Sequence, residues 1–452
     1  SRITTSIHYI EDIDSLRFAY SIVDEYNILK LQPHFPGYAV FCFIANILYL
    51  IIGNMGVVFS IIGGISIFII IYYSLRLMKI DINSITGIFV SLLIFFNPMF
   101  WIMSNRYMPD IMGLSVFVVS FYFLSYKNER SIVIGLLLTG ILSGIRISYL
   151  PLLFIPVLFI LINNKYNVRF YFAIFLGVMI WLLPMILITG LSDLINMGIK
   201  HTNGHFTDYG GTVLTESNWL LRLQYFFHTI WADGLGGYWI NRSFITIILS
   251  ILLIPLLIQL IKNLQFIFKD NSSLKILFIS TILYIAWILF FQNIIYKSRH
   301  VMPLILVLII FFSSSLKNNF LIYTNVKKIY FSLVIILTAY ISINLSIQHK
   351  QPTAIKKISQ YLISKEKPIM IISIPLINYY LKSQNVNANY IDLENNNEKV
   401  TLDLLDKNVF VIGNFSEKIN GLSTQLDTTF YHNPYVNRMW SDINIYSNKN
   451  LK

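Results

Sequence analysis

Long apolar runs constrain the fold of this chain more than any other feature. Between Gly56 and Tyr340, runs of about 17 or more apolar residues alternate with short polar loops. A helix of that length crosses hydrocarbon, where every backbone polar group must find its partner inside the protein. Because 56% of the residues are hydrophobic and only 12% are charged, a soluble core could not absorb the apolar excess. We predict a polytopic α-helical membrane protein.

We expect ten spans in the sequence. They run over residues 56–78, 84–103, 110–126, 131–147, 150–163, 169–190, 243–261, 275–292, 300–316 and 328–347. The chain starts at Ser1, without Met, on a polar segment, so an upstream signal peptide or a first span can have been removed.

Basic residues in the short loops predict the orientation of the spans, because loops rich in Lys and Arg stay in the cytoplasm. The basic loops carry Arg76 and Lys79, Lys127 and Arg130, Lys165 and Arg169, Lys262 with Lys269 and Lys275, and Lys317 with Lys327 and Lys328. They alternate with loops that are poor in basic residues. Membrane orientation therefore explains the net charge of +12 better than nucleic-acid binding does.

The opposite face receives the remaining loops, and we take it as extracytoplasmic. It holds the region before Gly56, the loop 105–110, the turn 146–149, the segment 191–242, the loop 293–299 and everything after 348. The apolar stretch Tyr38 to Ile52 should then lie along the outer interface rather than cross it. We expect an integral protein of the bacterial cytoplasmic (inner) membrane.

Three parts follow from this organisation. Residues 1–55 form a first outer loop with interfacial helices, and residues 56–348 form the transmembrane module, with its outer loop at 191–242. Residues 349–452 are rich in Asn, Lys and Asp, and short β-like runs such as Pro368 to Ile374 and Asn408 to Ile412 separate polar stretches. We expect a small soluble α/β domain there, on the extracytoplasmic side.

Two segments near the N-terminus carry candidate catalytic groups. Glu11, Asp12 and Asp14 place three carboxylates within four residues, which can bind a cation or supply a general base. The alternative is a solvated turn that caps the next helix, with Asp14 or Ser15 at its N-cap. In the segment 32–38, two prolines and a glycine fix a rigid turn that mounts His34 beside Tyr38. Its alternative is an interface turn anchored among head groups.

Buried cations form the second group of candidates. Arg106 and Asp110 lie four residues apart between two spans, and Arg146 interrupts an apolar stretch with no acidic residue nearby in sequence. A buried Arg needs an anionic partner, which is either a structural carboxylate such as Asp110 or a phosphate. Arg299 and His300 precede a span on the outer face, where basic residues are unexpected, and this implies an anion.

The long outer segment adds His201, His205, Asp208 and Glu216. The spacing of the histidines can suit a metal, but the segment has no settled helix and the signal is weak. The sequence therefore identifies no cofactor with certainty and leaves a divalent cation open. The acidic and basic candidates all map to one predicted side of the membrane, and this convergence favours an active site.

The order of these motifs resembles the GT-C superfamily of membrane glycosyltransferases, which includes the protein O-mannosyltransferases and the lipid A aminoarabinose transferases. The matching features are Asp12 and Asp14, the segment 33–38, Arg106-Tyr107 with Asp110, Gly144 with Arg146, and Arg299-His300 before Pro303. The resemblance implies an eleventh span before Ser1. It also implies a sugar donor on a polyprenyl phosphate, a first-loop carboxylate as the base, and outer-face Arg and Lys side chains that hold the phosphate.

We therefore expect a sugar transfer to a glycan, lipid or protein acceptor, in contact with membrane lipid and without nucleic acid. Asp14 or Asp12 is the base; Arg146, Arg299 and Arg106 bind the donor phosphate; His34, Tyr38, Asp110, His300, His205 and Glu216 shape the pocket. A transporter or flippase is the first alternative, but it should carry polar residues through its spans or internal repeats. A noncatalytic subunit of envelope polysaccharide assembly is the second.

Overall fold

The computed structural model describes residues 1–316, 324–366, 368–393, 400–401, 408–415, 419–420 and 424–448. The chain divides into two units by its internal contacts, and we describe each by itself. Unit 1 holds residues 1–7 and 17–347, and unit 2 holds residues 8–16 and 348–452. The division falls inside two helices, α1 (Ile13–Val23) and α15 (Thr324–His349).

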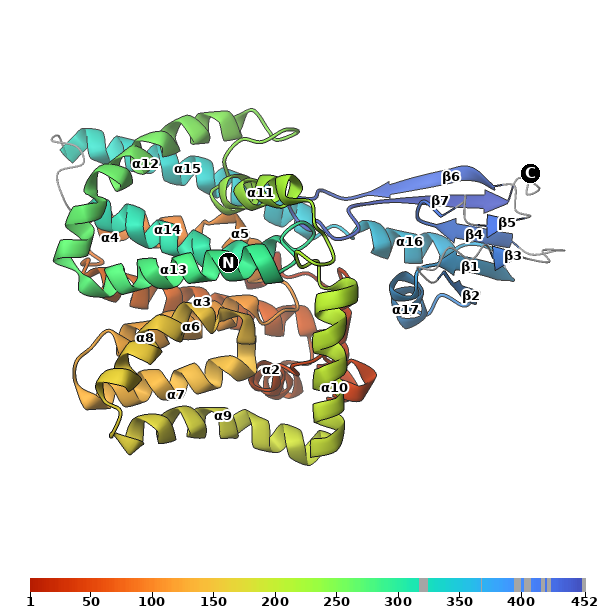
Figure 1. The fold of residues 1–452 in the computed structure, drawn as a ribbon. Helices are drawn as coiled ribbons and strands as arrows, with labels where there is room; N and C mark the ends of the chain where they lie inside the picture. Colours follow the sequence, from red (N-terminus) through yellow and green to blue (C-terminus); the bar gives the residue numbers. More distant parts are fainter. Residues whose placement is uncertain are drawn as a thin grey trace. The chain divides into compact units, whose positions relative to one another are not determined.

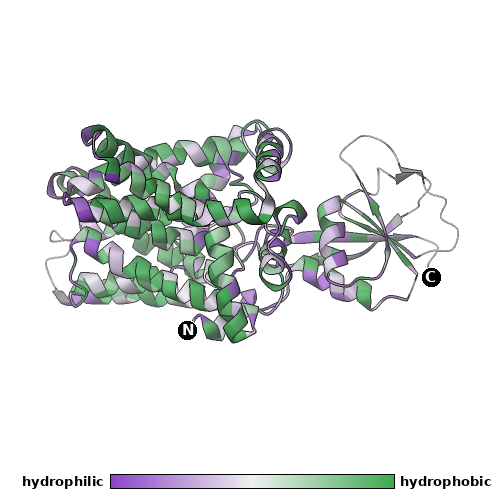
Figure 2. Ribbon diagram, turned by 90° about the horizontal axis from the view of Figure 1, so that it is seen from below, coloured by the Kyte–Doolittle hydropathy of each residue, from purple (hydrophilic) through white to green (hydrophobic). Residues whose placement is uncertain are grey.

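Unit 1 is a helical bundle (Figure 1). Besides parts of α1 and α15, it contains α2 (Ala39–Ile52), α3 (Met55–Met78), α4 (Ile85–Phe95), α5 (Pro98–Met103), α6 (Asp110–Leu124), α7 (Glu129–Arg146), α8 (Pro151–Asn163), α9 (Val168–Thr189), α10 (Leu191–Gly204), α11 (Trp219–His228), α12 (Ile245–Asp270), α13 (Ser272–Phe291) and α14 (Met302–Ser315). Apolar residues cover most of the bundle, and hydrophilic ones gather towards the helix ends (Figure 2). The prediction of a polytopic α-helical membrane protein is confirmed.

Seven helices in the described part of the chain are long and apolar enough to cross a membrane, judged by length and composition. They are α3, α7 with the short helix 147–149, α9, α12, α13, α14 together with the preceding residues 298–301, and the stretch Thr324–Ile363 that contains α15. The predicted spans 110–126 and 150–163 form α6 and α8, which have 15 and 13 residues and are shorter. The expected span 84–103 is wrong as a single helix, because α4 ends at Phe95 and Asn97 caps a new helix, α5, with Pro98 in its first turn.

Capping residues and glycines determine where these helices begin and how closely they approach. Asparagine side chains accept backbone N–H groups at the starts of α3, α7 and α9. At the contact between α7 and α9, a Cβ on Gly140 would lie 2.5 Å from the Ile174 carbonyl oxygen, and one on Gly177 would lie 2.2 Å from that of Leu137. The two backbones therefore touch only because both positions lack a side chain. This contact places the end of α7, where Arg146 lies.

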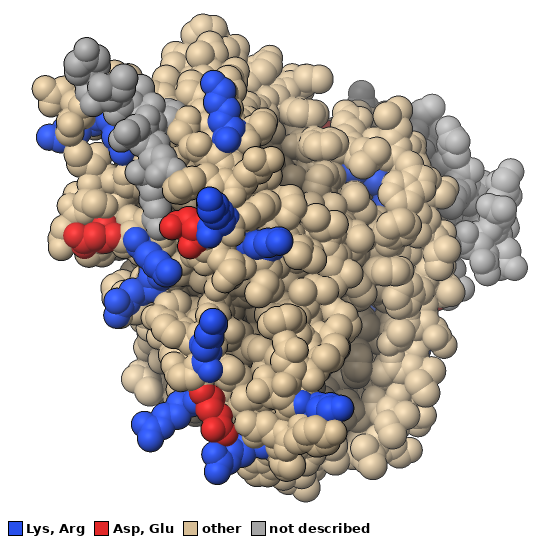
Figure 3. Space-filling model, turned by 60° about the vertical axis from the view of Figure 1, so that its left-hand side comes forward, with Lys and Arg blue, Asp and Glu red and all other residues tan. Residues whose placement is uncertain are grey.

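The predicted basic loops lie together at one end of unit 1 (Figure 1). They follow α3, α6, α8 and α12, and the last precedes α15; Lys317 lies outside the described residues. With this end turned forward, blue Lys and Arg side chains are spread over the surface and red acidic side chains are few (Figure 3). The helix ends that carry Arg146, Asp110 and Arg299 lie at the other end.

Unit 2 contains a five-stranded sheet with the strand order β2-β1-β4-β7-β6. Its strands are β1 (Ile369–Ser373), β2 (Asn389–Asp392), β4 (Asn408–Ile412), β6 (Thr424–Tyr431) and β7 (Asp442–Asn448); β3 (Val400–Thr401) and β5 (Ile419–Asn420) form a separate pair. β1 is parallel to β2 and β4, whereas β7 is antiparallel to β4 and β6. Helices α16 (Ala354–Ile363) and α17 (Pro375–Ser383) complete the unit.

Apolar side chains from the central strands form the core of this unit. Ile372, Val409 and Val411 are fully buried together with Leu393. Both segments that the sequence predicted as strands form strands, β1 and β4, so the expected small α/β domain is present. The structure differs from the sequence prediction in one respect. Residues 8–16, which the sequence places in the first outer loop 1–55, belong to unit 2.

Candidate active site

Arg146 is the last residue of α7, and buried charges gather around it. Its stem lies against α6, because a Cβ on Gly113 would fall only 2.7 Å from the Cβ of Arg146. The glycine at 113 therefore allows the two helices to approach here. Gly144 allows a similar approach two residues earlier, where a Cβ would fall 2.4 Å from the indole ring of Trp181.

Two guanidinium groups share one carboxylate in this cluster. Arg146 Nη2 lies 2.9 Å from Asp110 Oδ1, and Arg299 Nε lies 3.8 Å from the same oxygen. The side chains are 6%, 8% and 0% exposed for Arg146, Arg299 and Asp110. The sequence left open whether Asp110 or a phosphate neutralises Arg146, and the structure shows that Asp110 contacts it. The cluster thus places two buried guanidinium groups beside one carboxylate, and guanidinium groups suit anionic ligands such as phosphate.

Polar rings surround the guanidinium of Arg146. Its Nη1 donates to the hydroxyl of Tyr38 at 3.4 Å, and its Nη2 donates to His300 Nδ1 at 3.5 Å. Since a guanidinium only donates, Nδ1 of His300 is the acceptor. The hydroxyl of Tyr284 donates to the carbonyl of His300 at 2.9 Å and so holds the short helix η6 (Ser298–Val301) in place. Arg146 therefore contacts side chains from three separate segments of unit 1, Tyr38, Asp110 and His300.

The rigid turn predicted at residues 32–38 connects the Arg146 cluster to the histidines of α10. His34 Nε2 lies 3.2 Å from the Tyr38 hydroxyl, and Phe18 of α1 packs edge-on against Tyr38 with ring centres 5.0 Å apart. Gly37 has a φ of +91°, which few other residues adopt. The His34 ring lies 5.8 Å from that of His201 on α10. The predicted mounting of His34 beside Tyr38 is therefore observed.

A histidine pair extends the polar surface along α10. The rings of His201 and His205 are 6.4 Å apart, and the Tyr209 hydroxyl lies 3.1 Å from His201 Nδ1. Burial, followed by the nearby His205, Arg17 and Lys297, lowers the pKa of His201 to about 4. His201 is therefore neutral near pH 7, beside the positive charges of Arg17 and Lys297. No group of three or more His, Cys, Asp or Glu among the described residues has an arrangement that could hold a metal ion.

Two further predicted site residues lie in other segments of unit 1. Arg106 is buried in the loop between α5 and α6. Glu216 lies beyond the turn that begins at Thr212, and its charge acts on Arg222. Arg222 itself donates to the carbonyls of Leu289, Gly211 and Gln292 and so fastens α11 to the end of α13.

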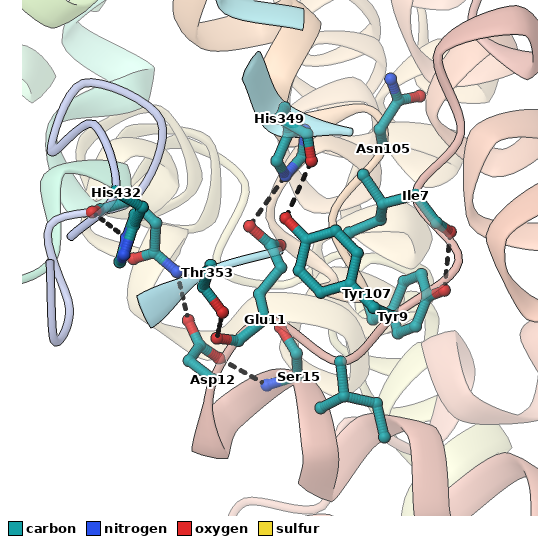
Figure 4. A network of polar contacts seen from close by, with 12 residues as sticks. Ile7, Tyr9, Glu11, Asp12, Ser15, Asn105, Tyr107, His349, Thr353 and His432 are labelled. Carbon is teal, nitrogen blue, oxygen red and sulfur yellow. Dashed lines mark hydrogen bonds and ion pairs between the residues drawn. The ribbon is translucent and has the colours of Figure 1, made fainter. Parts of the chain in front are cut away.

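The acidic segment belongs to unit 2. Glu11, Asp12 and Asp14 are buried, so the alternative of a solvated turn is wrong. The capping part of that alternative is correct, but the cap is Asp12 rather than Asp14 or Ser15. Asp12 Oδ1 accepts the backbone N–H of Ser15 at 2.9 Å, directly before α1 begins (Figure 4).

Sequence reasoning missed several residues around Arg146 and Glu11. Tyr149 is fully buried and its ring centre lies 5.9 Å from the Arg146 guanidinium carbon; its place three residues after Arg146 was a usable signal. Tyr284 lies within an apolar helix and gave no signal. His349, which pairs with Glu11 at 2.8 Å, lies 338 positions away in sequence and could not have been connected with it.

Comparison with known proteins gives two solved structures. The chain is similar to ArnT from Cupriavidus metallidurans in the apo state, with 10% identity over 98% of this chain and 95% of that chain and a TM-score of 0.48. It is similar to the same protein bound to undecaprenyl phosphate, with 9% identity, the same coverage and a TM-score of 0.46. No family model matches the chain. No curated protein matches it. At these TM-scores the likeness carries no argument about function, which we base on the chain's own residues.

Proposed function

We propose that this protein is a membrane glycosyltransferase that moves a sugar from a polyprenyl-phosphate carrier to an acceptor on the extracytoplasmic face. The observation that carries the proposal is the buried cluster in which Asp110 faces two guanidinium groups, Arg146 and Arg299. Two guanidinium groups side by side suit a phosphate, which a planar guanidinium can bind through two parallel hydrogen bonds. The motif order that resembles GT-C enzymes supports the same reading.

An apolar groove in unit 1 suits the polyprenyl chain. It has a volume of about 460 Å³ and is lined by Phe35, Ile147, Trp181, Leu194 and Ile195, among others. Ile147 follows Arg146 directly, and Phe35 follows His34, so the groove adjoins the cationic cluster through neighbouring residues. A lipid whose phosphate lies at Arg146 would therefore find apolar surface beside it.

The proposed reaction is a displacement at the anomeric carbon. A carboxylate takes the proton of the acceptor hydroxyl, whose oxygen forms the new bond to the anomeric carbon. The bond between that carbon and the phosphate oxygen breaks, and its electron pair stays on the phosphate. Arg146 and Arg299 stabilise the negative charge that develops on the leaving phosphate.

Asp14 is the preferred base of the two acidic candidates. Both oxygens of Asp12 accept hydrogen bonds, Oδ1 from the Ser15 N–H and Oδ2 from Asn437 Nδ2. Asp12 caps α1 through its Oδ1, so we propose that Asp14, two residues later in that helix, takes the proton of the acceptor.

The test is sugar transfer from radiolabelled polyprenyl-phosphate donors in membranes that hold the wild type or single variants. We expect Arg146→Ala and Asp14→Asn each to lower kcat by about 100-fold or more, because charge stabilisation and proton transfer act in the transition state. Arg146→Lys keeps the charge and should retain more activity than Arg146→Ala. Arg169→Ala, which removes an exposed Arg paired with Glu129, is the matched control and should behave as the wild type.

Two outcomes would contradict the proposal. Equal transfer by all variants would remove Arg146 and Asp14 from the reaction. Movement of the labelled lipid across the membrane without sugar transfer would favour the flippase, for which the Arg146 cluster would be a binding site only.

A further inference from the structure

A buried hydrogen-bond network in unit 2 joins the acidic segment to the C-terminal domain (Figure 4). His349 Nε2 and Glu11 Oε1 are 2.8 Å apart, and both side chains are 0% exposed. A carboxylate accepts, so Nε2 of His349 carries the hydrogen. The Thr353 hydroxyl donates to the Glu11 carbonyl at 2.8 Å, and the Tyr380 hydroxyl donates to the Ile10 carbonyl at 2.5 Å. The segment is thus held by both its backbone and its side chains.

The next carboxylate is held in the same way. Asn437 Nδ2 donates to Asp12 Oδ2 at 3.0 Å. His432 fixes this part of the domain, because its Nδ1 accepts the Ala354 N–H at 3.0 Å and its Nε2 donates to the Asn437 carbonyl at 2.8 Å. The partners of residues 10–12 therefore come from α15, from the start of α16, from α17 and from the loop between β6 and β7.

We propose that the C-terminal domain positions the catalytic segment, and that His349 is a positioning residue that acts through Glu11 on Asp12 and Asp14. This inference rests on the proposed function. Glu11 and His349 are fully buried, so substitution of either residue removes a buried hydrogen bond of the other. Asp12 caps the helix that carries Asp14 two residues later, so a displaced Glu11 displaces the base. The domain is then part of the catalytic machinery and not only an acceptor-binding module.

The test compares Glu11→Ala, Glu11→Gln and His349→Ala in the full chain. We expect Glu11→Ala and His349→Ala to lower kcat by about 10- to 100-fold, because a misplacement of about 1 Å has effects of this size, with the donor KM unchanged. Glu11→Gln keeps an oxygen that accepts from His349 and should retain most of the activity. Equal loss in Glu11→Gln and Glu11→Ala would overturn the positioning role, since it would mean that the charge of Glu11 takes part in the reaction.

A matched control separates positioning from general loss of stability. Asn378 is equally buried in unit 2, and its side chain donates to Ser373, Ile391 and Asp392, away from residues 8–16. Asn378→Ala should lower the melting temperature as His349→Ala does but leave kcat near the wild-type value. If both variants lose kcat equally, the inference is wrong.

A second measurement does not depend on the activity. Hydrogen exchange of the backbone amides in residues 10–16 should become at least tenfold faster in His349→Ala and stay unchanged in Asn378→Ala. If the wild type transfers no sugar but this exchange responds as expected, the proposed function fails and the domain still holds the segment. If the exchange does not respond, His349 does not hold the segment and the inference fails by itself.

Discussion

Asp110 lies between two guanidinium groups, and because it is buried, substitution of its carboxylate should strongly lower the stability of unit 1. It is 0% exposed, while Arg146 and Arg299 approach the same oxygen. Removal of one partner from a buried ion pair usually destabilises a protein by about 3–5 kcal/mol, because the remaining charge stays desolvated. Here one carboxylate contacts two guanidinium groups, so its loss removes a contact from both.

We expect Asp110→Asn to lower the free energy of unfolding by about 3 kcal/mol or more and to lower the melting temperature in detergent. A polyprenyl phosphate should raise that temperature more in the variant than in the wild type, because the added anion replaces the missing charge. Asp81→Asn, at an exposed acidic residue between α3 and α4, is the control and should change neither value. If the lipid stabilises neither protein, the cluster binds no phosphate.

At the scale of elements, the α7–α9 contact determines where Arg146 lies. Gly140 and Gly177 bring the two backbones together, and the Trp181 indole N–H lies 3.1 Å from both the Gly140 carbonyl and the Ser143 hydroxyl. Interfaces of small residues are typical of membrane helices, where close packing drives association. The candidate site therefore depends on residues that do not contact a ligand.

This contact gives a sharp comparison between two glycine-to-alanine changes. Gly177→Ala would place a Cβ 2.2 Å from a backbone carbonyl oxygen, so the helices must separate, and we expect a loss of about 1–3 kcal/mol and lower activity. Gly64→Ala is the matched control within α3, where the nearest atom to the new Cβ is 3.7 Å away. It should be neutral or slightly stabilising because Ala favours helices. Thermal unfolding would reveal the difference, and equal melting temperatures would contradict the described packing.

The sequence predicted the elements better than their boundaries and partners. Spans such as 56–78 and 169–190 coincide with α3 and α9, because a long apolar run has few alternatives to a helix in lipid. The break at Asn97 was missed although an Asn-Pro pair usually marks a helix start. Arg146 was recognisable as a buried cation, and Asp110 as one of its possible partners. Glu11 and His349 were not, because only the tertiary structure brings residues so distant in sequence together.

The distribution of charge over unit 1 has the form expected of a protein oriented in a membrane. Basic side chains cover one end (Figure 3), and the Arg146 cluster lies among the helix ends at the other. Short loops with an excess of Lys and Arg stay in the cytoplasm. The candidate site would then face the extracytoplasmic side, where the proposed donor is presented.

Labelling of single cysteines tests this orientation. Cys42, the only cysteine, is buried, and Cys42→Ser gives a background without thiols. A cysteine at Tyr166, which is 85% exposed in the basic loop after α8, should react with a membrane-impermeant maleimide only after the membrane is opened. One at Leu214, which is 74% exposed between α10 and α11, should react in intact cells. The opposite pattern would place the Arg146 cluster on the cytoplasmic side. It would exclude a sugar donor that is presented outside the cell. A cytoplasmic donor would then be the one compatible with the charges of this cluster.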